Sequence, residues 1–184
     1  MARRILFLGP PGAGKGTQAG MLAKALKVPH ISTGEMLRNA VADGSELGKQ
    51  VESVMAAGDL VSDDLVVAIV DERLDQEDAR CGYLLDGFPR NVAQANALND
   101  AVIDAIGTVL LLEVDTEELV SRLLKRADDE GRADDNEATI RRRLKVYHAE
   151  TAPLVEHYGD AVIRVDGVGG INEVFSRVAL ALAT

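Results

Sequence analysis

Residues 9–18 read Gly9-Pro10-Pro11-Gly12-Ala13-Gly14-Lys15-Gly16-Thr17-Gln18, and the rest of the chain is arranged around this turn. The apolar run Ile5-Leu6-Phe7-Leu8 precedes it, and residues 19–26 have apolar positions at helical spacing. These parts predict a strand, a glycine-rich turn and a helix. Because a helix N-terminus carries unpaired N–H groups and partial positive charge, a loop that leads into it binds anions readily.

The residue types of this turn predict what it binds. Its glycines let the backbone curl with N–H groups inward, and Lys15 adds a positive charge to a bound polyphosphate. The spacing Gly-x-x-x-x-Gly-Lys between a strand and a helix is typical of the nucleotide-binding P-loop. The motif usually has Ser or Thr directly after the lysine as a magnesium ligand, whereas here Gly16 intervenes before Thr17. Magnesium is therefore expected to be held mainly by nucleotide oxygens and water.

Composition and charge limit the classes of function. With 184 residues, 47% of them hydrophobic, the chain is expected to form one globular domain. A net charge of −10 argues against binding to nucleic acid or anionic membranes, which repel an acidic surface. The single cysteine, Cys81, is expected to be a buried residue of a protein in a reducing compartment. The longest aliphatic run, Val109–Leu112, is too short to span a membrane, so the sequence predicts a cytoplasmic protein.

Apolar runs and helical patterns alternate along the chain. Further strands are expected at residues 28–32, 82–87, 108–114 and 161–165. Further helices are expected at residues 63–75, 93–102, 116–127, 137–158 and 171–183. Residues 33–61, with several glycines between two short helical patterns, predict an inserted subdomain, and the polar residues 128–135 predict a mobile loop. The alternation predicts one doubly wound α/β domain with right-handed crossovers.

Asp86 ends the buried strand predicted at residues 82–87. A carboxylate at the carboxyl end of such a strand is typical beside a P-loop, because it can reach the nucleotide's magnesium, often through water. The alternative is that Asp86 caps the following helix. His30 is expected to be a strand residue with a satisfied side chain and not a catalyst, because no neighbour in the sequence would orient it as a base.

Several arginines fall in segments that are expected to meet near the P-loop. Planar guanidinium groups bind phosphate through two hydrogen bonds at once, which an ammonium group cannot do. Each arginine alone also fits a solvated surface position, but with the P-loop the set predicts two phosphate-bearing substrates. The arginines are Arg38, Arg90, Arg122, Arg126, Arg132 and Arg143.

The sequence closely resembles the adenylate kinases. The resemblance rests on residues 9–18, Ser32-Thr33-Gly34-Glu35-Met36-Leu37-Arg38, Asp86-Gly87-Phe88-Pro89-Arg90 with Gln94, Arg132-Ala133-Asp134-Asp135, and Arg143, in the family's order. It implies a P-loop NTPase-type doubly wound five-stranded parallel sheet with helices on both faces, and transfer of a phosphoryl group from MgATP to AMP to give two ADP. It also implies a core of residues 1–32, 62–126 and 135–184, a monophosphate-binding subdomain at 33–61 and a short lid at 127–134.

The resemblance implies a role for each matching residue. The implied ATP contacts are Gly12, Ala13, Gly14, Lys15, Gly16, Thr17, Arg122, Arg126, Arg132 and Gly169. The implied AMP contacts are Thr33, Arg38, Asp59, Val61, Gly87, Arg90, Gln94, Arg132 and Arg143. The implied catalytic residues are Lys15, Arg90, Arg122, Arg132 and Arg143. Asp86 is expected to hold magnesium through water, and Thr17 is a second candidate ligand.

The same resemblance implies the cofactor and partners. Mg²⁺ is expected to accompany ATP, and no structural zinc is expected because the short lid lacks cysteines. The expected partners are ATP, AMP and ADP, and a monomer is expected. A UMP/CMP kinase is the alternative of the same fold, but Thr33 and Gln94 favour AMP, since an amide can donate and accept on adenine's edge. A P-loop binding module without turnover is the alternative outside enzymes, although it would not need arginines on both sides of Asp86.

Overall fold

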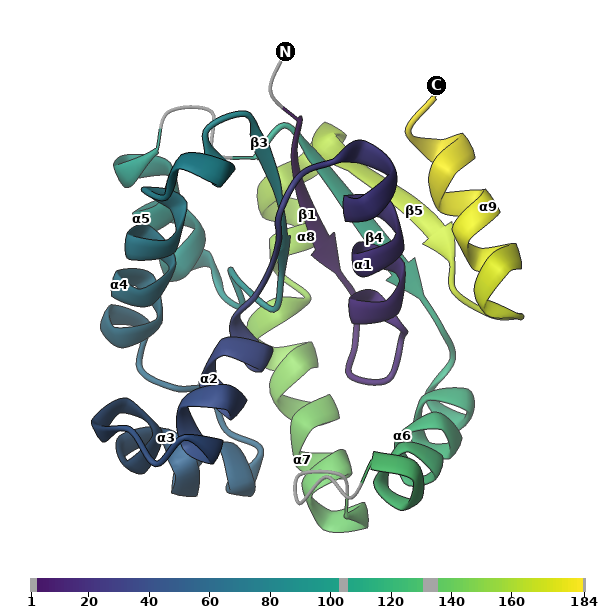
Figure 1. Cartoon of the computed structure of the whole chain (residues 1–184). Coiled ribbons are helices and arrows are strands. Elements are labelled where there is room, and N and C mark those ends of the chain that lie inside the picture. Colours follow the sequence, from purple (N-terminus) through teal and green to yellow (C-terminus); the bar gives the residue numbers. More distant parts are fainter. Residues whose placement is uncertain (1–2, 103–105, 131–135, 184) are drawn as a thin grey trace.

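The protein is built on one parallel sheet. The computed structural model describes residues 3–102, 106–130 and 136–183. The described strands are β1 (Arg3–Leu8), β2 (His30–Ser32), β3 (Gly82–Asp86), β4 (Thr108–Glu113) and β5 (Val162–Asp166). They pair in parallel in the order β2-β3-β1-β4-β5 (Figure 1). The expected doubly wound five-stranded sheet is therefore confirmed, with β1 at its centre.

Helices cover both faces of the sheet. The described α-helices are α1 (Lys15–Leu26), α2 (Thr33–Ala42), α3 (Glu46–Ala57), α4 (Asp63–Leu74), α5 (Val92–Ala101), α6 (Thr116–Glu130), α7 (Glu137–Val146), α8 (Leu154–Tyr158) and α9 (Ile171–Ala181). Short 3₁₀ turns occur at Glu77–Ala79 and Gly159–Ala161. Helices α1 and α9 lie together on one face, while α4, α5 and α8 lie on the other (Figure 1). Beyond the carboxyl ends of the strands, α2 and α3 pack together near α7.

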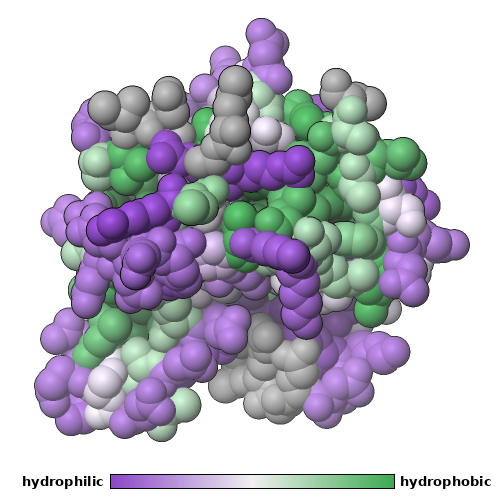
Figure 2. Space-filling model, turned by 45° about the horizontal axis from the view of Figure 1, so that its top comes forward, coloured by the Kyte–Doolittle hydropathy of each residue, from purple (hydrophilic) through white to green (hydrophobic). Residues whose placement is uncertain are grey.

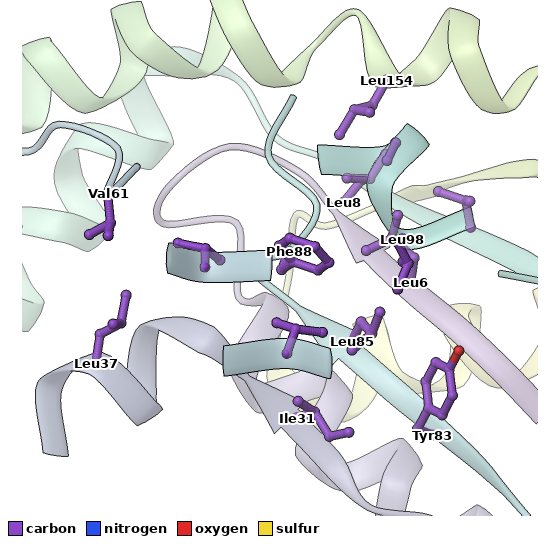
Figure 3. Close-up of a cluster of buried hydrophobic side chains, with 14 of the residues drawn as sticks. Leu6, Leu8, Ile31, Leu37, Val61, Tyr83, Leu85, Phe88, Leu98 and Leu154 are labelled. Carbon is purple, nitrogen blue, oxygen red and sulfur yellow. The ribbon is translucent and has the colours of Figure 1, made fainter. Parts of the chain in front are cut away.

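The core has two layers because side chains alternate along the central strands. In β1, Ile5 and Phe7 belong to the cluster beneath α1, α6, α7 and α9, whereas Leu6 and Leu8 belong to the cluster beneath α4, α5 and α8. All four side chains are at most 3% exposed. A strand that is apolar on both faces is typical of a parallel sheet between two helical layers. Figure 3 shows the second cluster, with Phe88 between Val61 and Leu37 on one side and the group of Leu6, Leu85 and Leu98 on the other.

Replacing Leu123 of α6 by alanine is expected to lower the free energy of unfolding by about 2–5 kcal/mol, because its side chain is 0% exposed and leaves a cavity in the core. Its neighbour Leu124 is 42% exposed. Leu124→Ala is therefore the matched control, and we expect a change of about 0.5 kcal/mol or less. Urea unfolding of both variants measures the difference. Equal losses for the two variants would contradict the assignment of Leu123 to the core.

The predicted helix 137–158 is wrong as a single element. Helix α7 ends at Val146, a π-helical turn occupies Tyr147–Thr151, and α8 follows. Pro153 has no N–H to donate, and its ring crowds the carbonyl group four residues earlier. The Ala152 N–H instead donates to the carbonyl of Tyr147, five residues back, at 2.8 Å. The π turn thus separates α7 from α8 just before Pro153.

Three other expectations need correction. Cys81 is exposed, and it lies between the 3₁₀ turn Glu77–Ala79 and the first residue of β3, outside the buried strand. Helix α6 continues to Glu130, so residues 128–130 are helical and not part of a polar loop. The other residues of that loop, 131–135, lie outside the described part of the chain. Helix α1, which follows the glycine-rich turn, begins at Lys15 and not at the start of the apolar pattern of residues 19–26.

The outer surface is mixed in polarity. The face that Figure 2 shows carries both hydrophilic and hydrophobic residues, and the hydrophobic ones gather in separate areas. Among the described residues, the helices are all too short or too polar to cross a lipid bilayer.

Candidate nucleotide site

The glycine-rich turn adopts backbone conformations that require glycine. Gly9 and Gly14 have φ angles of 143° and 91°, and Gly14 is the residue that precedes α1. A Cβ atom at Gly9 would lie 2.8 Å from the carbonyl oxygen of Leu112. At Gly14 a Cβ would meet nothing within 4 Å, so there the positive φ alone requires glycine. The turn therefore leads directly into the N-terminus of α1.

A cavity of about 530 Å³ opens beside this turn. Its walls come from the turn and from segments far apart in the sequence, including α2, the end of α3, the segment after β3, α6 and α7. The predicted site residues that line it are Gly12, Gly14, Lys15, Gly16, Thr17, Thr33, Arg38, Asp59, Val61, Asp86, Gly87, Arg90, Gln94, Arg126 and Arg143. The fold thus gathers most of the predicted ATP and AMP contacts around one space.

Lys15 lies on the wall of this cavity. Its ammonium group donates to the carbonyl oxygens of Gly9 at 2.8 Å and Pro10 at 3.0 Å. Burial lowers the pKa of Lys15 from 10.5 to about 8, and Asp86 opposes this shift. Three arginines, Arg90, Arg143 and Arg126, lower the pKa further by repulsion. Cationic groups from four elements are thus concentrated around one point, which favours a polyanionic ligand.

Asp86 fits the role of a carboxylate beside the nucleotide's magnesium. It is 8% exposed, and its Oδ2 lies 3.5 Å from the Cβ position of Gly16, at the start of α1. Burial raises its pKa, but the nearby His30 side chain and the charges of Lys15 and Arg90 outweigh this, so the pKa lies below its usual value. An ionised carboxylate oxygen is a ligand that Mg²⁺ prefers. Within the described residues, no group of three or more His, Cys, Asp or Glu side chains is placed to hold a metal ion.

The expectation that His30 has a satisfied side chain is wrong for one ring nitrogen. Nε2 is buried without a hydrogen-bond partner of good geometry, and Asp86 Oδ2 lies 3.5 Å from it. The pairing of β2 with β3 brings these two side chains together, since Ser32 is opposite Asp86 in the register. The neighbour of His30 therefore comes from the adjacent strand, which its sequence surroundings could not indicate.

The backbone after β3 organises the opposite wall of the cavity. The carbonyl oxygen of Gly87 accepts hydrogen bonds from Thr33 Oγ1 at 2.8 Å and from Arg90 Nε at 2.9 Å. Thr151, in the π turn, donates its hydroxyl to the carbonyl of Arg90 at 2.7 Å. These bonds hold Arg90 in place before any ligand binds. Sequence analysis missed Thr151, which is 61 residues from Arg90 and has no motif around it.

Asp59 lines the cavity but its carboxylate is already engaged. Arg142 of α7 donates to it twice, from Nε at 2.5 Å and from a terminal nitrogen at 2.6 Å. Next to it, a Cβ at Gly58 would lie 2.8 Å from a Thr139 methyl group. The end of α3 is therefore packed tightly onto α7. The sequence did not indicate the contact of Arg142 with Asp59, although it did predict Asp59 as an AMP contact.

Three described site residues do not line the cavity: Ala13, Arg122 and Gly169. Arg122 donates to Glu118 at 2.7 Å and to the carbonyl of Gly167 at 3.1 Å. A Cβ at Gly167 would lie 3.5 Å from the carbonyl oxygen of Ala13, so the loop after β5 borders the glycine-rich turn. Arg122 thus lies against this loop, beside the glycine-rich turn. Arg132 lies outside the described residues.

A P-loop that opens into a cationic cavity at the carboxyl edge of a parallel sheet defines the class of this protein. It is a P-loop protein of the α/β type, whose ligands bind where these strands end.

The comparisons with known proteins narrow this class. The family model described as "Adenylate kinase" matches residues 7–163. The adenylate kinases of Stenotrophomonas maltophilia (strain R551-3) and Xanthomonas campestris pv. campestris (strain B100) are each 50% identical over 185 residues, which cover 97% of this chain and 98% of the relative. That of Thermobifida fusca (strain YX) is 50% identical over 184 residues, 97% of each chain. The chain belongs to the adenylate kinase family.

Proposed function

We propose that this protein transfers the γ-phosphoryl group of MgATP to AMP and forms two ADP. The observation that carries the proposal is the concentration of Lys15, Arg90, Arg126 and Arg143 around one cavity beside the P-loop. One nucleotide would need the P-loop and its lysine. A second phosphate group explains why arginines from three other elements converge on the same space.

Phosphoryl transfer from ATP to AMP requires mainly that the two phosphate groups be held in line and that their negative charge be neutralised. An oxygen of the AMP phosphate attacks the γ-phosphorus with its own electron pair, and the bond from the γ-phosphorus to the bridging oxygen breaks, leaving that pair on ADP. The attacking phosphate is largely ionised at neutral pH because its second pKa is about 6, so no general base is required. Fixed cations offset the charge on the transferred group and align the reactants.

Magnesium would supply further neutralisation of the phosphate charge when bound with ATP. Asp86 would hold it, with Thr17 as a second candidate, because the buried, ionised carboxylate lies beside the first turn of α1. The residues of this chain bind and orient the phosphates around that ion.

Residues 33–61 are proposed to bind the monophosphate and residues 127–134 to form the lid. The first assignment is supported by the cavity wall, to which α2 and the end of α3 contribute. Closure of both segments would exclude water, which otherwise competes with AMP for the phosphoryl group. We further propose a cytoplasmic monomer that does not bind nucleic acid, in keeping with the net charge of −10.

A coupled assay tests the proposed function. ATP and Mg²⁺ are offered with AMP, UMP, CMP or GMP in turn, and ADP formation is followed. We expect AMP to be the best acceptor. Faster turnover with UMP and CMP would favour the alternative kinase of the same fold. Binding of ATP without ADP formation from any acceptor would indicate a binding module.

ATP binding is expected to take up protons near pH 8.5. Phosphate favours the ammonium form of Lys15, so binding raises a pKa that is about 8 in the protein alone, and affinity falls as pH rises above 8. In the protein alone, burial lowers the pKa of Lys15 from 10.5 to about 8, so the unfolded chain binds more protons between these pH values and this group's contribution to the free energy of unfolding rises with pH there. Calorimetric titration with ATP in two buffers of different ionisation enthalpy measures the uptake. The Lys15→Met variant should lose this part of the uptake.

A further inference from the structure

Asp63 contacts the residue that is proposed to recognise the base. It is the first residue of α4, and its Oδ1 accepts a hydrogen bond from Gln94 Nε2 at 2.7 Å. Gln94 is 1% exposed and lines the cavity, 31 residues away in the sequence. Asn91 donates to both carboxylate oxygens of Asp63, at 2.9 and 3.2 Å. The carboxylate is therefore tied to α5 at two side chains.

These contacts set the orientation of the Gln94 amide. A glutamine amide has nearly the same shape when its oxygen and nitrogen are exchanged, but its hydrogen bonding is reversed. Here Oε1 accepts from the backbone N–H of Arg90 at 2.7 Å, and Nε2 faces a carboxylate, which can only accept. The exchanged orientation would set oxygen against carboxylate and one donor against another. Both contacts would then be unfavourable.

The surroundings of Asp63 keep the carboxylate itself in place. Asn91 Oδ1 accepts from the Gln94 backbone N–H at 2.8 Å and caps α5, while its amide nitrogen points to Asp63. The N-terminus of α4 favours a negative charge at this position. Asp63 follows Val61 by two residues, and Val61 lines the same cavity. The hydrogen bonds of Asp63 therefore connect the end of the segment 33–61 to Gln94, the residue proposed to bind the base.

The Gln94 amide keeps one N–H and one oxygen lone pair beyond these bonds. Their order is fixed by the contacts with Asp63 and Arg90. A base with a 6-amino group and an unprotonated N1 offers a donor and an acceptor, whereas a 6-oxo base with a protonated N1 offers them in the opposite order. An amide held in one orientation can pair with only one of these edges.

We propose that Asp63 is a positioning residue that holds the Gln94 amide in one orientation and thereby makes the monophosphate site select 6-amino over 6-oxo purines. The inference rests on the proposed function, in which AMP occupies this part of the cavity. Asp63 touches no reacting atom. Its effect is transmitted through a single side chain.

The test compares AMP with IMP, which differ only at the 6-position and in the N1 proton. For Asp63→Asn we expect the ratio of kcat/KM for AMP to that for IMP to fall by about 10-fold or more, since an asparagine can donate to an exchanged amide as well as accept from the present one. The change should arise in the KM values for the monophosphates, with kcat for AMP and the KM for ATP within about twofold of the wild type. Asp63→Glu, which keeps an acceptor-only group, should retain most of the discrimination.

Asp64→Asn is the matched control, because Asp64 is the next residue, is exposed and lies in the same first turn of α4. It removes the same charge from the helix N-terminus and should leave the ratio unchanged. Asp63→Ala is a second variant that removes the acceptor, and it too should lower the ratio.

An unchanged AMP-to-IMP ratio in folded Asp63→Asn and Asp63→Ala variants overturns the inference. So does an equal loss for both monophosphates accompanied by a higher KM for ATP, which would indicate a general structural role. A wild-type protein without activity on AMP would instead contradict the proposed function. The two failures are therefore distinguishable.

Discussion

The Lys15→Met variant is expected to lose about 10³-fold in kcat, the largest effect of any single change considered. Lys15 is the one lysine of the glycine-rich turn, and its ammonium group lies at the carbonyls of Gly9 and Pro10, on the cavity wall. Methionine has a similar length without the charge, so the variant removes a fixed cation from the transferred phosphoryl group. Removal of one such stabilising group costs about 10²–10³-fold in comparable sites. Steady-state rates of ADP formation from ATP and AMP measure the loss.

Lys24→Met is the control for this variant. Lys24 lies on the same helix, α1, and is exposed. We expect its kcat to match that of the wild type. Near-normal turnover of Lys15→Met, with the fold confirmed by circular dichroism, would remove Lys15 from the mechanism and weaken the assignment of the turn as the phosphate site.

The Arg90→Ala variant is expected to lose about 10²–10³-fold in kcat and to have a raised KM for AMP. Arg90 is held by three contacts: its Nε donates to Gly87, its N–H donates to Gln94, and its carbonyl accepts from Thr151. The guanidinium group is thus positioned in advance for a phosphate. Arg90→Lys should restore only part of the rate, because an ammonium group cannot replace a planar fork that binds phosphate in two places.

Arg141→Ala provides the comparison for Arg90. The Arg141 side chain is 74% exposed on α7 and pairs with Glu137 in the same helix. Such exposed pairs contribute little, so we expect wild-type kinetics. If Arg90→Ala kept the KM for AMP and the kcat of the wild type, Arg90 would not contact the transferred group or the acceptor phosphate.

The local sequence was sufficient to predict those parts of the site that lie within one segment of the chain. The turn at residues 9–18 was predicted with its flanking strand and helix because glycine spacing and apolar pattern act on neighbouring residues. The same holds for the strand that ends at Asp86. The sequence did not indicate the π turn that interrupts the helix expected at 137–158, because one extra residue in a single turn leaves the apolar pattern on either side helical.

Contacts between distant segments were not predictable in this way. The two hydrogen bonds from Arg142 to Asp59 span 83 residues, and the approach of His30 to Asp86 depends on the register of β2 against β3. Arg122 was expected among the ATP contacts, yet in this structure it is bound to Glu118 and Gly167, outside the cavity wall. A guanidinium group on a long side chain can reach several partners, and only the packing of α6 against the loop after β5 selects among them.

The sequence by itself determined that the chain has a phosphate-binding turn between a strand and a helix, in a parallel α/β domain. Glycine spacing and apolar periodicity encode these features through backbone conformation and burial, which are local. Only the tertiary structure decided the environment of each side chain: the lowered pKa of Lys15, the exposure of Cys81 and the orientation of the Gln94 amide beside Asp63. These depend on distances between elements that are far apart in the chain, and a few tenths of an ångström in such distances separate a hydrogen bond from a mere neighbour.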